Sequence, residues 1–153
     1  AASVPRVDPD LLLTGALVHD VGVIDAIDVG AGLHASEEGR LLGHHLLGVR
    51  RIEAALAGLN PGLTTDARVG LLHMIGAHHD AEVREGRLPQ TLEALMLSRA
   101  DRMDSDVARF LDATGRARIV GERWTDEDNP FGRRLRVPEG ESASAAVGAG
   151  AVA

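Results

Sequence analysis

Histidine and aspartate residues stand within or at the ends of leucine-rich segments whose spacing predicts helices. The residues of this set come from separate segments and are His19, Asp20, His44, His78, His79 and Asp101. Apolar helices rarely carry imidazoles and carboxylates on their inner faces, because burying a charge without a partner is costly. The pattern therefore predicts a helical fold in which these side chains converge on a metal ion.

The composition favours a core of aliphatic side chains within packed helices. Of the 153 residues, 44% are hydrophobic and only 2% are aromatic, so the core must consist of Leu, Val, Ile and Ala. Such a core is more typical of helices than of sheets. A chain of this length forms one domain with a real core. Because no run of about 18 apolar residues and no leader segment occurs, we expect a cytoplasmic protein without membrane contact.

Charge and the lack of cysteine limit the kinds of site that the chain can carry. Without Cys, disulfides and thiolate zinc sites are excluded, so a metal must be held by imidazoles and carboxylates. The net charge of −7 argues against broad, nonspecific binding to nucleic acid. Six Arg nevertheless lie between Arg116 and Arg136. A solvated surface is the favoured interpretation of this segment, and a phosphate-binding strip is the alternative.

Capping residues and apolar periodicity predict four helices. Asp, Ser and Thr side chains can accept hydrogen bonds from the free amides of a first helical turn, and Pro suits the first helical position. The expected helices begin near Asp8-Pro9, Ser36, Thr64 and Thr91, and end near Gly22, Gly58, His79 and Gly115. We expect a loop at residues 23–35, where Gly30 and Gly32 stand.

The fourth helix carries a stripe of residues at steps of three and four. The stripe consists of Leu97, Asp101, Asp104, Ala108 and Leu111. This spacing predicts that the stripe is the buried face of the helix. A carboxylate at Asp101 would then be costly without a cation or several hydrogen-bond donors.

The helices are expected to form a single all-α domain over residues 8–138. Residues 1–7 are interpreted as an N-terminal extension. Residues 116–138 lose the helical period, so we expect an irregular or partly extended segment there. Residues 139–153 are rich in Gly, Ala and Ser, which indicates a flexible tail.

Adjacent ligand-type residues at helix ends can fill one or two metal sites. Asp20 can share one ion with His19 and bridge to a second, and His78-His79 offers a comparable pair. The donors are nitrogen and oxygen without sulfur, which suits one or two Mn²⁺, Mg²⁺, Fe²⁺ or Ni²⁺ ions per chain. Two ions about 3.5–4 Å apart would stabilise the attacking and the leaving oxygen of a phosphoester. The predicted chemistry is therefore phosphoester hydrolysis.

Three further histidines are weaker candidates. His34 stands in the expected loop and His73 on a leucine-rich stretch, and a lone histidine is more often a core or surface residue than a ligand. Both are therefore left out of the predicted site. In the second helix the spacing favours His45, which lies closer than His44 to the centre of the apolar stripe.

The arrangement of these motifs resembles the HD-domain metal-dependent phosphohydrolases, and especially their YhaM-type 3′–5′ exoribonuclease branch. The resemblance covers roughly residues 10–138. The segments that carry it are residues 12–22 with His19-Asp20, residues 38–44 with Gly43-His44, residues 72–79 with His78-His79, residues 93–104 with Asp101, and Asp128-Asn129 with Phe131. It implies an HD-domain helical bundle with an irregular C-terminal segment, and it selects His44 over His45.

The resemblance implies a role for each residue of the set. One metal would be held by His19, Asp20 and Asp101, and Asp20 would bridge to a second metal held by His44, His78 and His79. Hydroxide on a metal would attack the phosphorus, which makes His19 and Asp20 the implied catalytic residues. Implied substrates are RNA or single-stranded nucleic-acid ends, or a small phosphoester or nucleotide. Substrate-binding residues and self-association into a homo-oligomer stay open.

Some features depart from the family pattern. The family places another His on a helix upstream of the His-Asp pair, whereas no His occurs among the 18 residues before His19. Either the chain is a fragment, or water completes the first metal site. Val23 also stands where the family has Lys, a cation near the phosphate. The OB domain of YhaM-type enzymes is not found here either. These departures motivate the alternative of a degenerate HD domain that binds a nucleotide or protein partner without catalysis.

Overall fold

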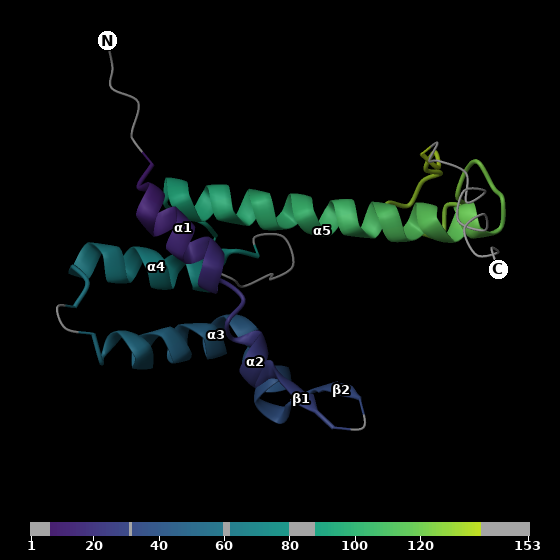
Figure 1. Ribbon diagram of the computed structural model, residues 1–153. Helices are drawn as coiled ribbons and strands as arrows, with labels where there is room; N and C mark the ends of the chain where they lie inside the picture. Colours follow the sequence, from purple (N-terminus) through teal and green to yellow (C-terminus); the bar gives the residue numbers. More distant parts are fainter. Residues whose placement is uncertain (1–6, 31, 60–61, 80–87, 139–153) are drawn as a thin grey trace, which may run out of the picture. The chain divides into compact units, whose positions relative to one another are not determined.

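The computed structural model describes residues 7–30, 32–59, 62–79 and 88–138 of the chain. Helices dominate this part, which confirms the expected all-α class, with one small hairpin added. The elements in chain order are α1 (Pro9–Val18), α2 (Val23–Ala26), β1 (Ile27–Val29), β2 (Leu33–Ala35), α3 (Glu37–Leu56), α4 (Thr65–Ala77) and α5 (Leu92–Ile119) (Figure 1). The expected tail at residues 139–153 and most of the expected extension at residues 1–7 lie outside the described residues.

The chain divides into two compact units, which are described separately. Unit 1 comprises residues 1–103, and unit 2 comprises residues 104–153, so α5 contributes to both. Among the described residues, no helix has both the length and the apolar character that crossing a membrane requires.

The predicted capping residues begin the long helices. Each side-chain oxygen accepts a hydrogen bond from a backbone amide two or three residues further along, at 2.8–3.2 Å. These capping residues are Asp8 for α1, Ser36 for α3, Thr64 for α4 and Thr91 for α5. Local hydrogen bonding therefore determines where these helices start, as the sequence predicts.

The segment after the first helix differs from the prediction. Helix α1 ends at Val18 instead of near Gly22, and residues 23–35 form α2 and a hairpin instead of a loop. Strands β1 and β2 are antiparallel, with Ile27 opposite Ala35. The expectation was wrong because alternating apolar residues on both sides of a glycine-rich turn favour a hairpin.

The core of unit 1 lies between α1, α4 and the first part of α5. Met74 and Ala94 are fully buried there, and Leu11 and Leu12 of α1 pack against them. Helix α4 also contacts α3, which in turn packs against α2, so α4 lies between α1 and α3 (Figure 1). Leu47 is the buried contribution of α3. This packing brings the ends of α1 and α4 close to the middle of α3.

The predicted stripe of α5 is only partly buried. Leu97 is buried and Asp101 is half-buried, but the stripe residues beyond Met103 are exposed, and Leu111 retains 58% exposure. The prediction of one continuous buried face was therefore wrong. Unit 1 ends at Met103, and in unit 2 a different face of α5, with Ala113 and Thr114, is buried. The helix also continues to Ile119, beyond the expected end near Gly115.

The segment after α5 is partly extended, as the loss of helical period predicts. Trp124 and Arg136 form an isolated antiparallel bridge, and the amide of Thr125 donates to the carbonyl of Leu135 at 3.0 Å. The Phe131 ring lies edge-on to Phe110 of α5, with ring centroids 6.0 Å apart. A small turn of chain is thus fixed to the C-terminal part of α5 within unit 2.

Candidate metal centre

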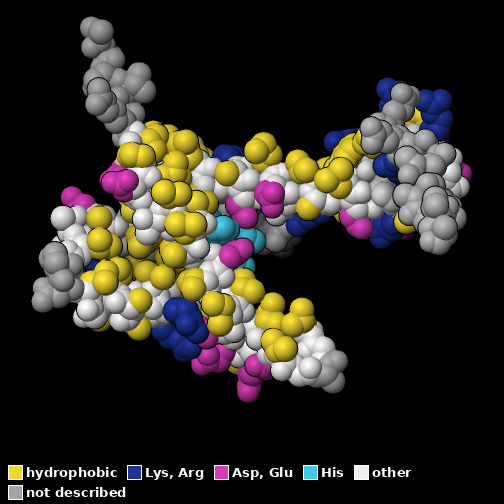
Figure 2. All heavy atoms as spheres, in the orientation of Figure 1, with side chains coloured by type: hydrophobic (Ala, Val, Ile, Leu, Met, Phe, Trp, Pro, Cys, Tyr) yellow, Lys and Arg dark blue, Asp and Glu magenta, His cyan; other side chains and the backbone are white. Residues whose placement is uncertain are grey.

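Imidazoles and carboxylates from four parts of the fold meet at one place in unit 1. They follow α1, lie in the middle of α3, close α4 and stand on α5, and they are His19, Asp20, His44, His45, His78, His79 and Asp101. We call these seven side chains the His-Asp cluster. Figure 2 shows histidine side chains gathered beside acidic ones at the surface. All six residues of the predicted set belong to the cluster, and their binding of a metal stays a prediction.

Asp20 occupies the centre of the His-Asp cluster. Its Oδ1 lies 3.4 Å from Nε2 of His44 and 3.4 Å from Nε2 of His78. Its Oδ2 lies 3.5 Å from Nε2 of His19. The side chain remains 51% exposed. One carboxylate thus faces imidazoles on two sides while staying open to solvent, an arrangement suited to a ligand shared by two ions.

Asp101 connects the two sides of the cluster from α5. Its Oδ1 lies 3.7 Å from Nε2 of His19, and its Oδ2 lies 3.4 Å from Nε2 of His79. The side chain is 21% exposed. Burying the Asp101 carboxylate is costly, and the nearby imidazoles offset part of this cost. A cation between them would offset more of it.

Helix ends orient two of the imidazoles. His19 closes α1 and places Nδ1 2.9 Å from the carbonyl oxygen of Ala16. His78 closes α4 and places Nδ1 2.8 Å from the carbonyl oxygen of Ile75. A proton on Nδ1 satisfies a carbonyl that has no partner in the last helical turn. It leaves the lone pair of Nε2 directed into the cluster, which is the usual orientation of a metal-binding histidine.

Several ring nitrogens in the cluster are buried without a hydrogen bond. These atoms are Nε2 of His44, His45 and His78. The ligand atoms of His44, His45, His78 and His79 all lie within 4.8 Å of one another, and those of His19, Asp20 and His78 form a second such group. Buried polar atoms are normally paired, and each exception calls for an explanation. The described residues of unit 1 thus offer two groups of side chains that could hold a metal ion.

The cluster holds its inner imidazoles in the uncharged form. Burial and, after it, the neighbouring imidazoles, His44 first, lower the pKa of His45 to about 3. Burial also lowers the pKa of His78 to about 4 and lowers that of His44. At neutral pH these rings are therefore neutral and have a free lone pair, as metal ligation requires.

A backbone kink at Gly43 immediately precedes His44 and His45 in α3. Gly43 has φ 69° and ψ 158° inside α3, a conformation that is essentially restricted to glycine. The helix restarts after it, and the rings of His44 and His45 lie side by side with centroids 4.0 Å apart.

Replacing Gly43 by alanine is expected to destabilise unit 1. The cost arises from backbone strain alone, because a Cβ at this position meets no other atom within 4 Å. We expect the free energy of unfolding to fall by about 1–3 kcal/mol. Urea denaturation measures the effect. Gly30→Ala is the matched control, since Gly30 also has open space but no positive φ. Equal stability of the two variants would contradict the assigned kink.

Gly22 lets the turn that contains His19 and Asp20 pack closely against α3. A Cβ on Gly22 would overlap the carbonyl oxygen of His44 and the backbone amide of Gly48. Only glycine allows the two backbones to approach this closely. The absence of a side chain at Gly22 therefore brings Asp20 within reach of the imidazole of His44.

The histidines excluded by the sequence lie outside the two candidate metal groups. His34 is exposed on β2, and Nε2 of His73 accepts a hydrogen bond from the amide of Gln90 at 2.9 Å. His45, in contrast, lies inside the cluster although the resemblance had favoured His44 alone. The spacing of the apolar stripe in α3 was the signal that pointed to it.

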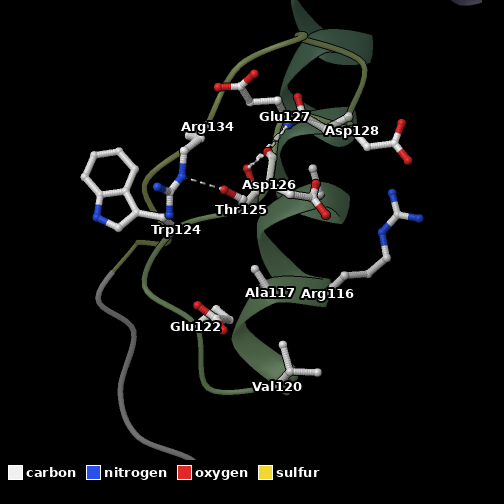
Figure 3. Close-up of a pocket in the computed structure, with 12 residues that line it drawn as sticks. Arg116, Ala117, Val120, Glu122, Trp124, Thr125, Asp126, Glu127, Asp128 and Arg134 are labelled. Carbon is white, nitrogen blue, oxygen red and sulfur yellow. Dashed lines mark hydrogen bonds between the residues drawn. The ribbon is translucent and has the colours of Figure 1, made fainter.

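Unit 2 carries a separate cavity of about 700 Å³. Figure 3 shows Arg116, Trp124 and Arg134 along its wall together with several acidic side chains. Arg134 donates to the carbonyl of Thr125, and Arg116 pairs with Asp112 at 2.8 Å. The ion pair with Asp112 offsets the charge of Arg116, and acidic side chains share the cavity wall, which favours the solvated surface over the phosphate-binding strip.

Comparisons with known proteins place the helical region in one family. The family model described as HD domain matches residues 1–106. Three curated relatives named 3′–5′ exoribonuclease YhaM, from Geobacillus sp. (strain WCH70), Bacillus subtilis (strain 168) and Halalkalibacterium halodurans, are 32%, 30% and 31% identical. The matches cover 66%, 66% and 69% of this chain. They cover 31%, 32% and 32% of the relatives, so the chain spans about a third of their length. No solved structure matches the chain.

Proposed function

Because the chain belongs to the HD domain family, we propose that it is a divalent-metal-dependent phosphodiesterase with its metal centre in the His-Asp cluster. Family membership and the exoribonuclease relatives support a metal-dependent phosphohydrolase. The observation that carries the proposal is the set of buried Nε2 atoms, unpaired by hydrogen bonds, around the Asp20 carboxylate. A cation would satisfy these atoms together.

The proposed ligands divide into two sets that share Asp20. His19 and Asp101 complete one set on the side of α1 and α5. The second set adds the imidazoles of α3 and α4, and consists of His44, His78 and His79. Bound divalent ions would polarise a phosphoryl oxygen and lower the pKa of bound water. The donor atoms are nitrogen and oxygen, which leaves Mn²⁺, Mg²⁺, Fe²⁺ and Ni²⁺ as candidates.

The exposure of the ligands indicates from which side a substrate would approach. The side chain of His78 has no exposed surface and forms the floor of the cluster. Asp20, with half of its side chain exposed, forms the open side. A phosphoester would therefore enter over Asp20, with the neutral imidazoles behind it. His19 is next to Asp20 and would position it from α1.

We extend the proposal to RNA or another single-stranded nucleic-acid end as substrate, cut in the 3′–5′ direction. The names of the relatives support this substrate class. A small phosphoester or nucleotide would use the same chemistry without requiring a long binding surface. The overall charge of −7 favours recognition at a chain end over broad contact with a polyanion.

A second candidate is a degenerate HD domain that binds a nucleotide or protein partner without catalysis. Val23 favours it. This residue is half-buried on α2, three residues after Asp20, and brings no positive charge to the site. A cation near a phosphoryl group stabilises the charge of the transition state, so its absence would lower the rate more than the binding.

Metal-dependent turnover tests the proposal. The purified chain should contain a divalent ion and should hydrolyse bis-p-nitrophenyl phosphate in the presence of Mn²⁺. EDTA should abolish turnover, and excess Mn²⁺ should restore it. A short RNA labelled at its 5′ end should shorten stepwise from the 3′ end. Bound metal without turnover would favour the binding-only candidate, whereas absence of both metal and turnover would refute the metal centre.

A further inference from the structure

His45 is a half-buried imidazole that the six-ligand proposal leaves without a role. Its Nε2 is buried and makes no hydrogen bond. His73 shows the contrasting situation, because its Nε2 accepts a hydrogen bond from the backbone. A histidine retained only for packing would also leave a polar atom unsatisfied at this depth. The nitrogen of His45 therefore calls for a partner inside the cluster.

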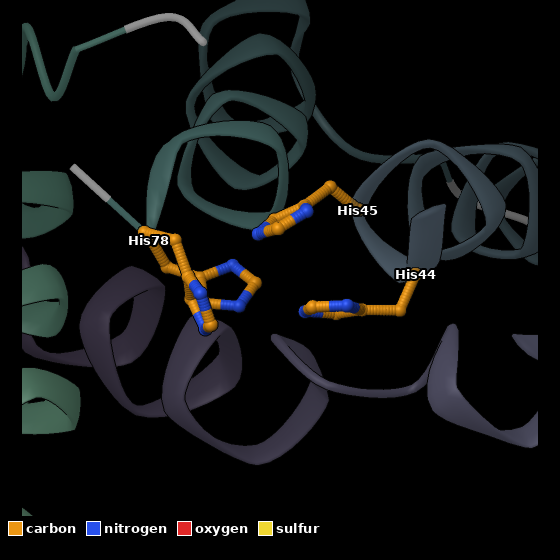
Figure 4. A group of neighbouring side chains, drawn as sticks. His44, His45 and His78 are labelled. Atoms are coloured by element: carbon orange, nitrogen blue, oxygen red, sulfur yellow. The ribbon is translucent and has the colours of Figure 1, made fainter. Parts of the chain in front are cut away.

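The ring of His45 faces the imidazoles at the end of α4. Its centroid lies 4.6 Å from that of His78 and 4.8 Å from that of His79. Figure 4 shows the rings of His44, His45 and His78 converging on one point from α3 and α4. A ligand nitrogen of His45 lies within 4.8 Å of a ligand nitrogen of each of the other three histidines. The four rings thus bring their nitrogen donors close to one another.

We infer that His45 is a further metal ligand, which makes the α3–α4 side of the cluster a four-imidazole site that favours Zn²⁺ over Mg²⁺. The site consists of His44, His45, His78 and His79. The inference rests on the proposed metal centre and adds a ligand and a metal preference to it. Four nitrogen donors suit the tetrahedral coordination of zinc, whereas magnesium requires oxygen ligands in octahedral geometry.

The two sides of the cluster would then differ in metal preference. The side with His19, Asp20 and Asp101 offers carboxylate oxygens, which suit Mn²⁺ or Mg²⁺. The four-imidazole side offers nitrogens, with Asp20 Oδ1 as a neighbour of His44 and His78 at 3.4 Å. Loss of His45 should therefore weaken zinc binding and leave manganese binding unchanged.

The variant His45→Phe tests the inference, since it keeps an aromatic ring and removes the nitrogens. We expect Zn²⁺ affinity, measured by competition with a chromophoric chelator, to fall at least roughly 10- to 100-fold, the loss typical for removal of even an outer-shell partner. Mn²⁺ affinity should stay within about twofold of the wild type. His34→Phe, on the exposed face of β2, is the matched control and should change neither affinity.

X-ray absorption on the Zn²⁺-loaded wild-type chain gives a second measurement that does not depend on a variant folding. It should count four imidazole nitrogens around zinc at about 2.0–2.1 Å. Fewer than four imidazole nitrogens around zinc, or unchanged zinc affinity in His45→Phe, would overturn the role of His45 while leaving the metal centre in place. A wild-type chain that binds neither Zn²⁺ nor Mn²⁺ would instead refute the proposed function itself.

Discussion

Replacing Asp20 by asparagine is expected to lower Mn²⁺-dependent phosphodiester hydrolysis on the order of 10³-fold, because a loss of about 4 kcal/mol lies within the contribution of a Lewis-acid metal. Asp20 is the carboxylate that faces His19, His44 and His78 at 3.4–3.5 Å. Asparagine keeps the shape of the side chain and removes the charge that attracts the ions. Both proposed metal sets should therefore weaken together.

The fold should tolerate this replacement. The Asp20 side chain is 51% exposed, and surface substitutions usually change stability by about 0.5 kcal/mol or less. Asp28→Asn, on the exposed strand β1, is the matched control and should retain full activity. Activity and metal content are measured together, with circular dichroism to confirm folding. Wild-type turnover in a folded Asp20→Asn chain would show that the cluster does not perform the reaction.

The sequence predicts the helices well where local chemistry determines them. The capping side chains Asp8, Ser36, Thr64 and Thr91 bond to the first amides of their helices, which makes each start a local event. The hairpin at residues 27–35 was missed, because Gly30 and Gly32 predict a loop when the alternating apolar residues on both sides of them are not considered. The prediction that the stripe of α5 is buried was wrong beyond Met103. Periodicity identifies the apolar face of a helix and not the element that covers it.

The candidate site was also predictable from the sequence only in part. The ligand-type residues could be identified because pairs such as His19-Asp20 and His78-His79 are unusual at the ends of apolar helices. Spacing favoured His45 and the resemblance selected His44, whereas the structure places both rings in the cluster. The positive φ of Gly43 interrupts α3 immediately before both histidines, which an ideal helical period does not anticipate. Glycine alone in the sequence does not reveal which conformation it adopts.

The metal-free chain is expected to lose stability steeply as the pH falls from about 6.5 to about 4. In the folded chain, burial lowers the pKa of His45 to about 3 and that of His78 to about 4. In the unfolded chain both pKa values return to about 6.5. Between these limits the unfolded state binds more protons, so protonation favours unfolding. The stability contributed by the neutral rings is complete above pH about 6.5 and is lost towards the folded pKa values.

The size of this loss of stability follows from the number of protons that the chain takes up on unfolding. Each imidazole protonated only on unfolding lowers the free energy of unfolding by about 1.4 kcal/mol per pH unit. His78, which has no exposed surface, should contribute nearly this full amount, and the partly exposed His45 should contribute less. Between about pH 6.5 and about pH 4 the two rings together remove at most roughly 7 kcal/mol, which is comparable with the about 5–15 kcal/mol by which domains are stable, so the metal-free chain should be much less stable at pH 4 than at pH 7.

Urea denaturation of EDTA-treated chain between pH 8 and pH 4 measures this dependence. His45→Phe should reduce the slope because it removes one of the protonated rings, whereas His34→Phe, remote from the cluster, should leave the slope unchanged. Zn²⁺ should raise the denaturation midpoint at neutral pH and lose this effect in acid, because protons and metal compete for the same lone pairs. A midpoint that stays constant down to pH 4 would mean that the inner imidazoles accept protons within the folded chain. The cluster would then not be the neutral ligand set that metal binding requires.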